Sequence, residues 1–166
     1  MRDLFSFPNP VNEVSARLVA AGVVVLCALI LLLDQPWLMV PLAYGFVARV
    51  LTGPKLSPLG QLVTRMVTPS LPIEPKLVPG PPKRFAQAMG ATMSVAAVAA
   101  HFAFGAAGLA DVLVAMILFA ATLEALFAFC IGCKVFGLLM GAGLIPDDVC
   151  ADCTDIWARQ RATASG

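Results

Sequence analysis

The chain has 166 residues, of which 60% are hydrophobic and 13% are charged, whereas soluble domains are about 45–50% apolar and about 25% charged. This composition excludes an ordinary soluble domain and indicates an integral membrane protein. The net charge of +1 excludes the broadly basic surface that drives nucleic-acid binding.

The first long apolar run follows a segment that carries Asp3 and Glu13 and lacks a small-residue cleavage site, so we expect no cleaved signal peptide. About 20 mostly apolar residues are needed to cross a bilayer as a helix. The run LVAAGVVVLCALILLL, with its flanks, predicts a first span over about 17–34. Within it, Cys27 is interpreted as a small buried hydrophobic residue.

Two further apolar runs predict a second span over 36–52 and a third over 86–108. The second run contains Pro41 and Gly45 and is short, but Trp37 and Tyr44 suit membrane interfaces, where aromatic residues gather. The third run is rich in Ala and Gly, the small residues that let membrane helices approach closely.

A Pro-rich linker over 53–84 separates the second and third runs. Within it, LSPLGQLVTRMV (56–67) places apolar residues at helical spacing. This pattern fits either a helix lying on the membrane surface between spans 2 and 3 or a connector tucked under the bundle.

The last apolar run, 110–145, would measure about 50 Å as one straight helix, which exceeds the hydrocarbon thickness of roughly 30 Å. We therefore predict a fourth span over 110–132 or longer that tilts, breaks or leaves the bilayer. A cysteine-containing tail follows over 141–166.

Loop charges predict the orientation, because Lys and Arg concentrate on the cytoplasmic side. The connections near Asp34 and Asp111 contain no Lys or Arg, whereas the segment 49–84 contains six: Arg49, Lys55, Arg65, Lys76, Lys83 and Arg84. The predicted fold class is an all-α membrane protein, a single domain over 1–166. It is a four-transmembrane-helix bundle with both termini in the cytoplasm.

Four cysteines have the spacing C-x2-C-x16-C-x2-C, formed by Cys130, Cys133, Cys150 and Cys153. This spacing is typical of a four-thiolate zinc site. The first pair, however, lies in an apolar run rather than on the polar turns that usually hold structural zinc.

The same spacing fits redox chemistry. Cys130 and Cys133, three residues apart, would share one helix face, and Gly132 between them would weaken the helix. Lys134 would favour a thiolate, and the tail pair would exchange disulfides with the first pair. Acidic residues beside the tail pair disfavour thiolates there.

Two ionisable residues, His101 and Glu124, fall within predicted spans, which makes each a functional candidate. Either residue could instead satisfy a structural need. His101 could donate to a neighbouring carbonyl group. Glu124 could carry protons to or from the thiols, or pair with Arg17, Arg49 or His101.

The segments NPVNEVSAR, GPKLSPLGQLVTR, PGPPKRFAQAMG and LEALFAFCIGCKVF together resemble the bacterial family catalogued as domain of unknown function 4395. The resemblance covers about residues 8–140. It implies a multi-pass protein of the bacterial inner membrane. It also implies traffic of thiols or sulfur with a thioredoxin-like protein or a sulfurtransferase.

We therefore expect a membrane-embedded thiol-redox or sulfur-relay protein that uses Cys130 and Cys133, tuned by Lys134, with Glu124 handling protons. A quinone would be a natural electron acceptor, but no quinone motif is present. The alternative is a structural protein whose four thiolates bind zinc, as a small subunit of a larger membrane complex. Homo-oligomerisation through the Gly and Ala faces is a further expectation. Whether the protein is an enzyme, and on which substrate, is left open.

Overall fold

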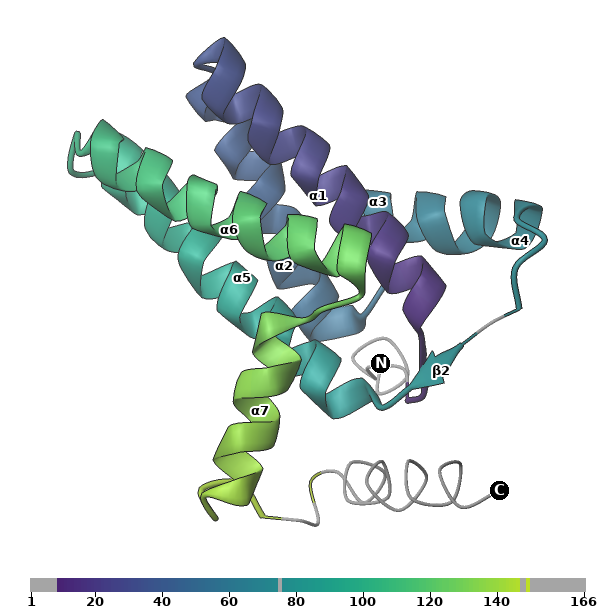
Figure 1. The fold of residues 1–166 in the computed structure, drawn as a ribbon. Helices are drawn as coiled ribbons and strands as arrows, with labels where there is room; N and C mark the ends of the chain where they lie inside the picture. The colour runs from purple at the N-terminus through teal and green to yellow at the C-terminus, as the bar shows by residue number, and fades with distance from the viewer. Residues whose placement is uncertain (1–8, 75, 147–148, 150–166) are drawn as a thin grey trace, which may run out of the picture.

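A computed structural model describes residues 9–74, 76–146 and 149, and this part of the chain is mostly helical (Figure 1). The bundle is built so that α1 packs on α6, α6 on α5, and α5 on α2. Its four main helices are α1 (Glu13–Leu33), α2 (Met39–Thr52), α5 (Gly80–Phe102) and α6 (Ala107–Phe127).

Three of these helices, α1, α5 and α6, are long and apolar enough to cross a membrane. The helix α2, preceded by the 3-10 turn η1 (Pro36–Leu38), is apolar but shorter. The all-α class predicted from the sequence is thereby confirmed, and the protein has the helices of a membrane protein.

The helix α5 begins six residues before the predicted third span and ends at Phe102 rather than at residue 108. Its first turn contains Pro81 and Pro82, which are tolerated there because the first N–H groups of a helix have no intrahelical partner. Gly105, with φ of +64°, then forms the turn into α6. As a consequence Lys83, expected in the linker, lies inside the helix.

The linker contains a continuous helical segment, made of α3 (Pro58–Leu62), the π-helical turn η2 (Val63–Val67) and α4 (Thr68–Ser70). Figure 1 shows it projecting from the side of the bundle. Its first turn packs against α1, where Leu59 lies on Gly22. Leu62 and Met66 are exposed. The segment predicted to have helical spacing is therefore helical, and its start is held by the bundle.

A two-strand antiparallel ladder joins the beginnings of α1 and α5. The strands are β1 (Val11–Asn12) and β2 (Leu77–Val78). The side chain of Asn12 then caps α1 by accepting a hydrogen bond from the backbone N–H of Val14 at 3.0 Å. This arrangement ties both helix starts to one end of the bundle.

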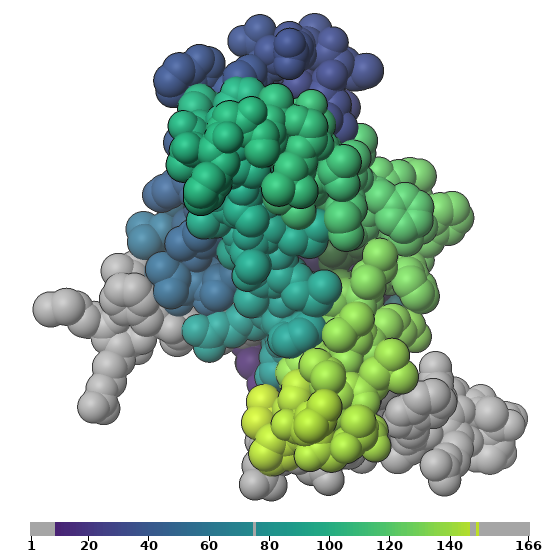
Figure 2. All heavy atoms as spheres, turned by 90° about the vertical axis from the view of Figure 1, so that its left-hand side faces the viewer, coloured from purple at the N-terminus to yellow at the C-terminus, as the bar shows by residue number. Residues whose placement is uncertain are grey.

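The apolar run 110–145 breaks, which is one of the three alternatives predicted from its length. The helix α6 ends where Ala128 adopts a left-handed conformation with φ of 54°, and α7 (Ile131–Gly141) continues in a new direction. Figures 1 and 2 show α7 leaving the bundle at the end where α5 begins, and α7 packs on α5.

The core lies between the four main helices, and Cys27 is fully buried in it. Close packing replaces the hydrophobic driving force between membrane helices. At Gly90, a Cβ atom would lie only 2.3 Å from the ring of Phe46, so the missing side chain lets α2 and α5 approach.

Candidate functional site: the cysteine pair at the break between α6 and α7

The break between α6 and α7 places the two cysteines at the start of a helix. Cys130 is the N-cap residue of α7, and its Sγ accepts a hydrogen bond from the backbone N–H of Cys133 at 3.4 Å. The sequence spacing predicted both cysteines on one helix face, but Cys130 lies just before the helix and has extended backbone geometry. The first turn of a helix carries unpaired N–H groups that favour negative charge. A thiolate at Cys130 would be stabilised by them.

The two thiols are electronically different. A hydrogen bond from the Cys133 thiol lowers the pKa of Cys130 below its ordinary value, and this effect outweighs burial, which acts in the opposite direction. The same hydrogen bond, together with burial, raises the pKa of Cys133. The positive charge of Lys83 favours the thiolate form of both, and the negative charge of Glu124 opposes it; the effect of Glu124 on the pKa is the larger at Cys130, and that of Lys83 is the larger at Cys133. Cys130 is therefore the thiol that ionises first.

A buried ion pair lies beside the cysteines. Lys83 Nζ in the first turn of α5 lies 2.5 Å from Glu124 Oε1 in the last turn of α6, and the side chains are 10% and 16% exposed. Of the partners that the sequence analysis offered for Glu124, Arg17, Arg49 and His101, none forms this pair. Those proposals missed Lys83 because they assigned it to the linker, although Pro81 and Pro82 signal a helix start.

Arg49 of α2 is a second buried cation at this end of the bundle, with 6% of its surface exposed. Its Nε donates to Gln87 Oε1 at 2.9 Å, and its Nη1 donates to Ser57 Oγ at 3.2 Å. The guanidinium carbon lies 4.6 Å from the ring centroid of Phe46. These partners are all neutral.

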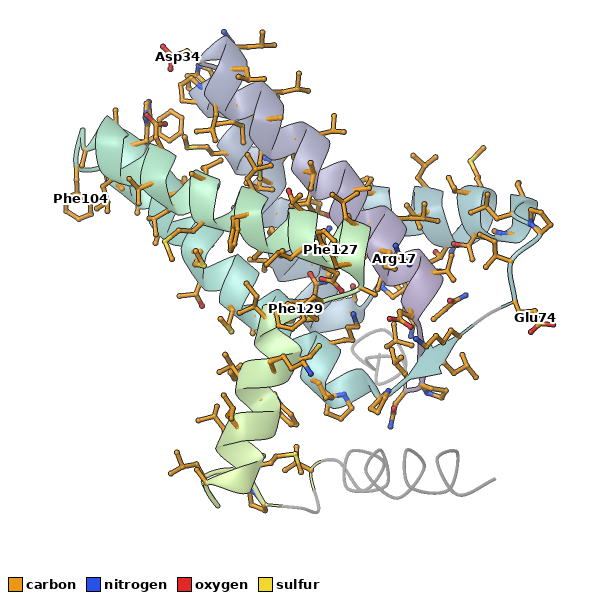
Figure 3. All side chains as sticks on the ribbon, in the orientation of Figure 1. Arg17, Asp34, Glu74, Phe104, Phe127 and Phe129 are labelled. Carbon is orange, nitrogen blue, oxygen red and sulfur yellow. The ribbon has the colours of Figure 1, made fainter. Side chains whose placement is uncertain are left out.

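Arg17 completes the end of α6. It donates from Nε and Nη2 to the carbonyl oxygen of Ala125, at 3.1 and 3.0 Å, and from Nη2 to that of Leu126 at 3.1 Å. The last carbonyl groups of a helix have no intrahelical partner. Figure 3 shows Arg17 on α1 at this end of α6, with Phe127 and Phe129, whereas Asp34 and Phe104 lie at the opposite end.

Gly132, between the two cysteines, allows α7 to contact α5. A Cβ atom at this position would lie 2.6 Å from both Cα and Cβ of Ala86. The sequence predicted that Gly132 weakens the helix. The structure also places it at a close crossing of α7 and α5, between Cys130 and Cys133 in the chain.

A groove of about 700 Å³ runs between the start of α5 and α7, and both thiols line it. A smaller cavity of about 100 Å³ lies on the inner side of Cys130 and contains Glu124, Arg49 and Gln87. Cys130 thus lines both a mostly apolar inner cavity that contains three polar side chains and the groove. The lining of the groove also includes Lys83, Lys134, Phe127, Phe129 and Phe136.

Two residues selected from the sequence lie apart from the ion pair. Lys134 Nζ lies 5.7 Å from the ring centroid of Phe129 at the groove. His101 lies near the far end of α5 against Phe102, with ring centroids 4.8 Å apart. In the described part of the chain, buried His101 Nδ1 has no hydrogen-bond partner.

The structure describes only two of the four predicted zinc ligands. Cys130 and Cys133 come together, whereas Cys150 and Cys153 lie outside the described residues. Among the described residues, no group of three His, Cys, Asp or Glu side chains could hold a metal ion. The four-thiolate site stays a prediction.

No curated protein and no solved structure matches the chain. A family model does match, over residues 11–141, which include α1 to α7, the ion pair and both groove cysteines. The protein therefore belongs to the family described as Domain of unknown function (DUF4395).

Proposed function

We propose that the protein carries out thiol–disulfide exchange at a membrane, with Cys130 as the attacking thiol and Cys133 as the resolving thiol. The observation that carries this proposal is the position of Cys130 as the N-cap of α7, facing a groove of about 700 Å³ that Cys133 also lines. A thiolate at a helix N-terminus beside a lysine is the usual setting of a reactive cysteine.

The exchange proceeds in two balanced steps. The Cys130 thiolate attacks one sulfur of a disulfide on a thioredoxin-like partner, forming a mixed disulfide and releasing one partner thiolate, which takes up a proton. Cys133 then loses its proton and attacks the Cys130 sulfur, releasing the second partner thiol. The partner gains two electrons, and the Cys130–Cys133 pair loses two.

A sulfur relay would use the same first thiolate. Cys130 would attack the outer sulfur of a donor persulfide, such as one on a sulfurtransferase, and the donor thiolate would leave. Cys130 would then carry the persulfide in the groove, with Cys133 positioned to displace the outer sulfur as hydrosulfide by forming the disulfide.

The charged neighbours divide the work. Lys83 stabilises the Cys130 thiolate, a role that the sequence analysis gave to Lys134, and Lys134 lies at the groove, where it would meet an incoming partner. Glu124 lines the inner cavity with Cys130. Its charge acts on Cys133 as well, and we propose that it takes the proton that leaves Cys133.

The proposed setting is the bacterial inner membrane, crossed four times, with both termini in the cytoplasm and residues 1–166 forming one domain. Besides α1, α5 and α6, the proposed additional crossing is Pro36–Thr52, whose 17 residues span about 25 Å. The cysteine end carries Arg17, Arg49, Lys83 and Arg84, which supports its cytoplasmic placement. The segment from α3 to α4, with Leu62 and Met66 exposed, would lie on the membrane surface.

The deciding experiment combines a metal analysis with a count of free thiols on detergent-purified protein. We expect no bound metal, and two thiols that disappear and return as the redox buffer is changed. Replacing Cys130 or Cys133 by Ser should abolish this change, whereas Cys27→Ser should preserve it. About one zinc per chain with four protected thiols would overturn the proposal and establish the four-thiolate site.

A further inference from the structure

A second cavity, distinct from the cysteine groove, lies between the start of α1, the end of α2, α3 and the start of α5. Its volume is about 190 Å³, several times the roughly 30 Å³ that one water molecule occupies in the liquid. Arg49 and Lys83 both line it, and neither cysteine does. None of the described residues that line it is Asp or Glu.

The two cations at this cavity are deeply buried. Counted over the whole residue, Arg49 is 6% exposed and Lys83 is 8% exposed. A buried charge is costly unless an opposite charge meets it. Glu124 is the carboxylate paired with Lys83, and it lines the inner cavity by Cys130 instead of this one. Another buried carboxylate at this end, Glu13, pairs with the exposed Lys76 and does not line this cavity. Within the cavity itself the two cations therefore face no carboxylate of a described residue.

Polar residues of the cavity lining supply hydrogen-bond donors. Arg49 has five N–H donors, of which two serve the neutral side chains of Gln87 and Ser57. Because Gln87 Oε1 accepts from Arg49, the amide group presents its two N–H donors to other partners. Thr64 and Ser15 also line the cavity, but their hydroxyl groups already have partners: Thr64 donates to the carbonyl oxygen of Gly60 at 2.7 Å, and Ser15 Oγ is hydrogen-bonded to Thr68 Oγ1 at 2.9 Å.

From this arrangement we propose that the cavity binds a tetrahedral oxyanion, a phosphate or sulfate group, through Arg49 and Lys83. The planar guanidinium matches such groups with two parallel hydrogen bonds. The cavity lies at the end of the bundle where α1 and α5 begin, so the phosphate can belong to a free ion or to a lipid headgroup. The site goes beyond the thiol chemistry and does not depend on it.

The test uses delipidated full-length protein in detergent, titrated with inorganic phosphate by calorimetry. We expect saturable binding of about one phosphate per chain. Lys83→Gln should weaken this binding at least about tenfold, because it removes a charged hydrogen bond. Arg49→Lys keeps the charge and removes the planar pair of donors, and should also weaken it.

Three controls isolate the site. Arg65→Gln removes a positive charge from an exposed position on η2 outside the cavity and should leave the affinity unchanged. Cys130→Ser should also leave phosphate binding intact, which separates this site from the thiol chemistry. Far-ultraviolet circular dichroism and gel filtration establish that each variant is folded.

A lipid source gives a different result. The purified protein would then retain about one phospholipid per chain by mass spectrometry, free phosphate would fail to bind, and Arg49→Lys would lose the lipid. The proposal is overturned if neither phosphate nor phospholipid binds to folded protein. It is also overturned if Arg65→Gln weakens binding as much as Lys83→Gln does.

Discussion

The sulfur atom of Cys130 takes part in two hydrogen bonds. It caps α7 by accepting the N–H of Cys133, and it also accepts the hydrogen bond of the Cys133 thiol. Any change at Cys133 therefore alters the ionisation of Cys130. The pH dependence of the reactivity of Cys130 therefore reports on its hydrogen bond with the Cys133 thiol.

The alkylation of Cys130 should follow a pKa below that of an ordinary thiol. The variant for this test has Cys27, Cys150 and Cys153 replaced by serine. We expect the rate of its reaction with iodoacetamide to rise at a lower pH than for an ordinary thiol, because the thiolate is the reactive form. Cys133→Ala removes the hydrogen bond that lowers the Cys130 pKa, so the rate curve should move to higher pH. Rates measured from about pH 5 to about pH 10 cover both curves. Identical curves would mean that the thiols do not interact.

The ion pair of Lys83 and Glu124 should be costly to break. Glu124→Gln leaves a buried positive charge without its partner, and we expect a loss of roughly 3–5 kcal/mol in the free energy of unfolding. Unfolding in mixed detergent measures it. Glu74→Gln makes the same chemical change at an exposed position and should have little effect.

The double variant Lys83→Met with Glu124→Leu tests the reason for that cost. Removing both charges leaves neither partner of this ion pair alone in the interior, so much of the lost stability should return, although Arg49 still loses the favourable charge of Glu124. If the double variant is as unstable as the sum of the single variants, the two residues act independently.

At the scale of elements, the contact between α7 and α5 depends on one missing side chain. Gly132→Ala would place a Cβ atom 2.6 Å from Ala86 Cα, and backbone atoms cannot yield as a flexible side chain can. We expect α7 to shift away from α5, at a cost of about 1–3 kcal/mol in stability. The reactivity of Cys130 should change with it.

Gly137 provides the matched control in the same helix. A Cβ atom there meets nothing within 4 Å. Gly137→Ala should therefore leave the contact intact and stabilise α7 by roughly 0.5–1 kcal/mol, through the higher helix propensity of Ala. Thermal unfolding followed by circular dichroism compares the two variants. Equal effects of both substitutions would argue against the close crossing at Gly132.

The elements differ in how well the sequence could predict them. Hydropathy and length located α1, α5 and α6 and required a break after residue 110, because one straight helix would be too long. The position of the break was not predictable, since Ala128 adopts a left-handed conformation that alanine seldom takes. Lys83 was assignable to α5 from the two prolines before it, but its pairing with Glu124 depends on helix packing. The role of Gly132 likewise depends on α5.

At the scale of the whole molecule, the two ends of the bundle differ in chemistry. The cysteine end holds the ion pair, Arg17 and Arg49, whereas the opposite end carries Asp34, with Trp37 packed on Phe102 at a centroid distance of 5.0 Å. This polarity is the basis of the proposed orientation, because positive residues remain on the cytoplasmic side.

Single cysteines introduced into a cysteine-free variant test that orientation. Gln35→Cys and Phe104→Cys lie at the opposite end and should react with a membrane-impermeant maleimide in intact cells. Glu74→Cys should react only after the membrane is permeabilised. The reverse pattern would invert the orientation, and labelling of Gln35→Cys and Phe104→Cys on different sides would remove α2 as a crossing.

The bonds from Arg17 to the end of α6 also constrain the order of assembly during synthesis. Arg17 and the carbonyl group of Ala125 are separated by 108 residues, and Lys83 precedes Glu124 by 41. Contacts between such distant residues form late, after the loops between them close. Both thiols follow α6 in the sequence, so they are synthesised before these contacts have closed. The surroundings of the proposed attacking thiol are therefore completed only after α6 has packed on α1 and α5, and a chain that ends before residue 130 lacks both thiols.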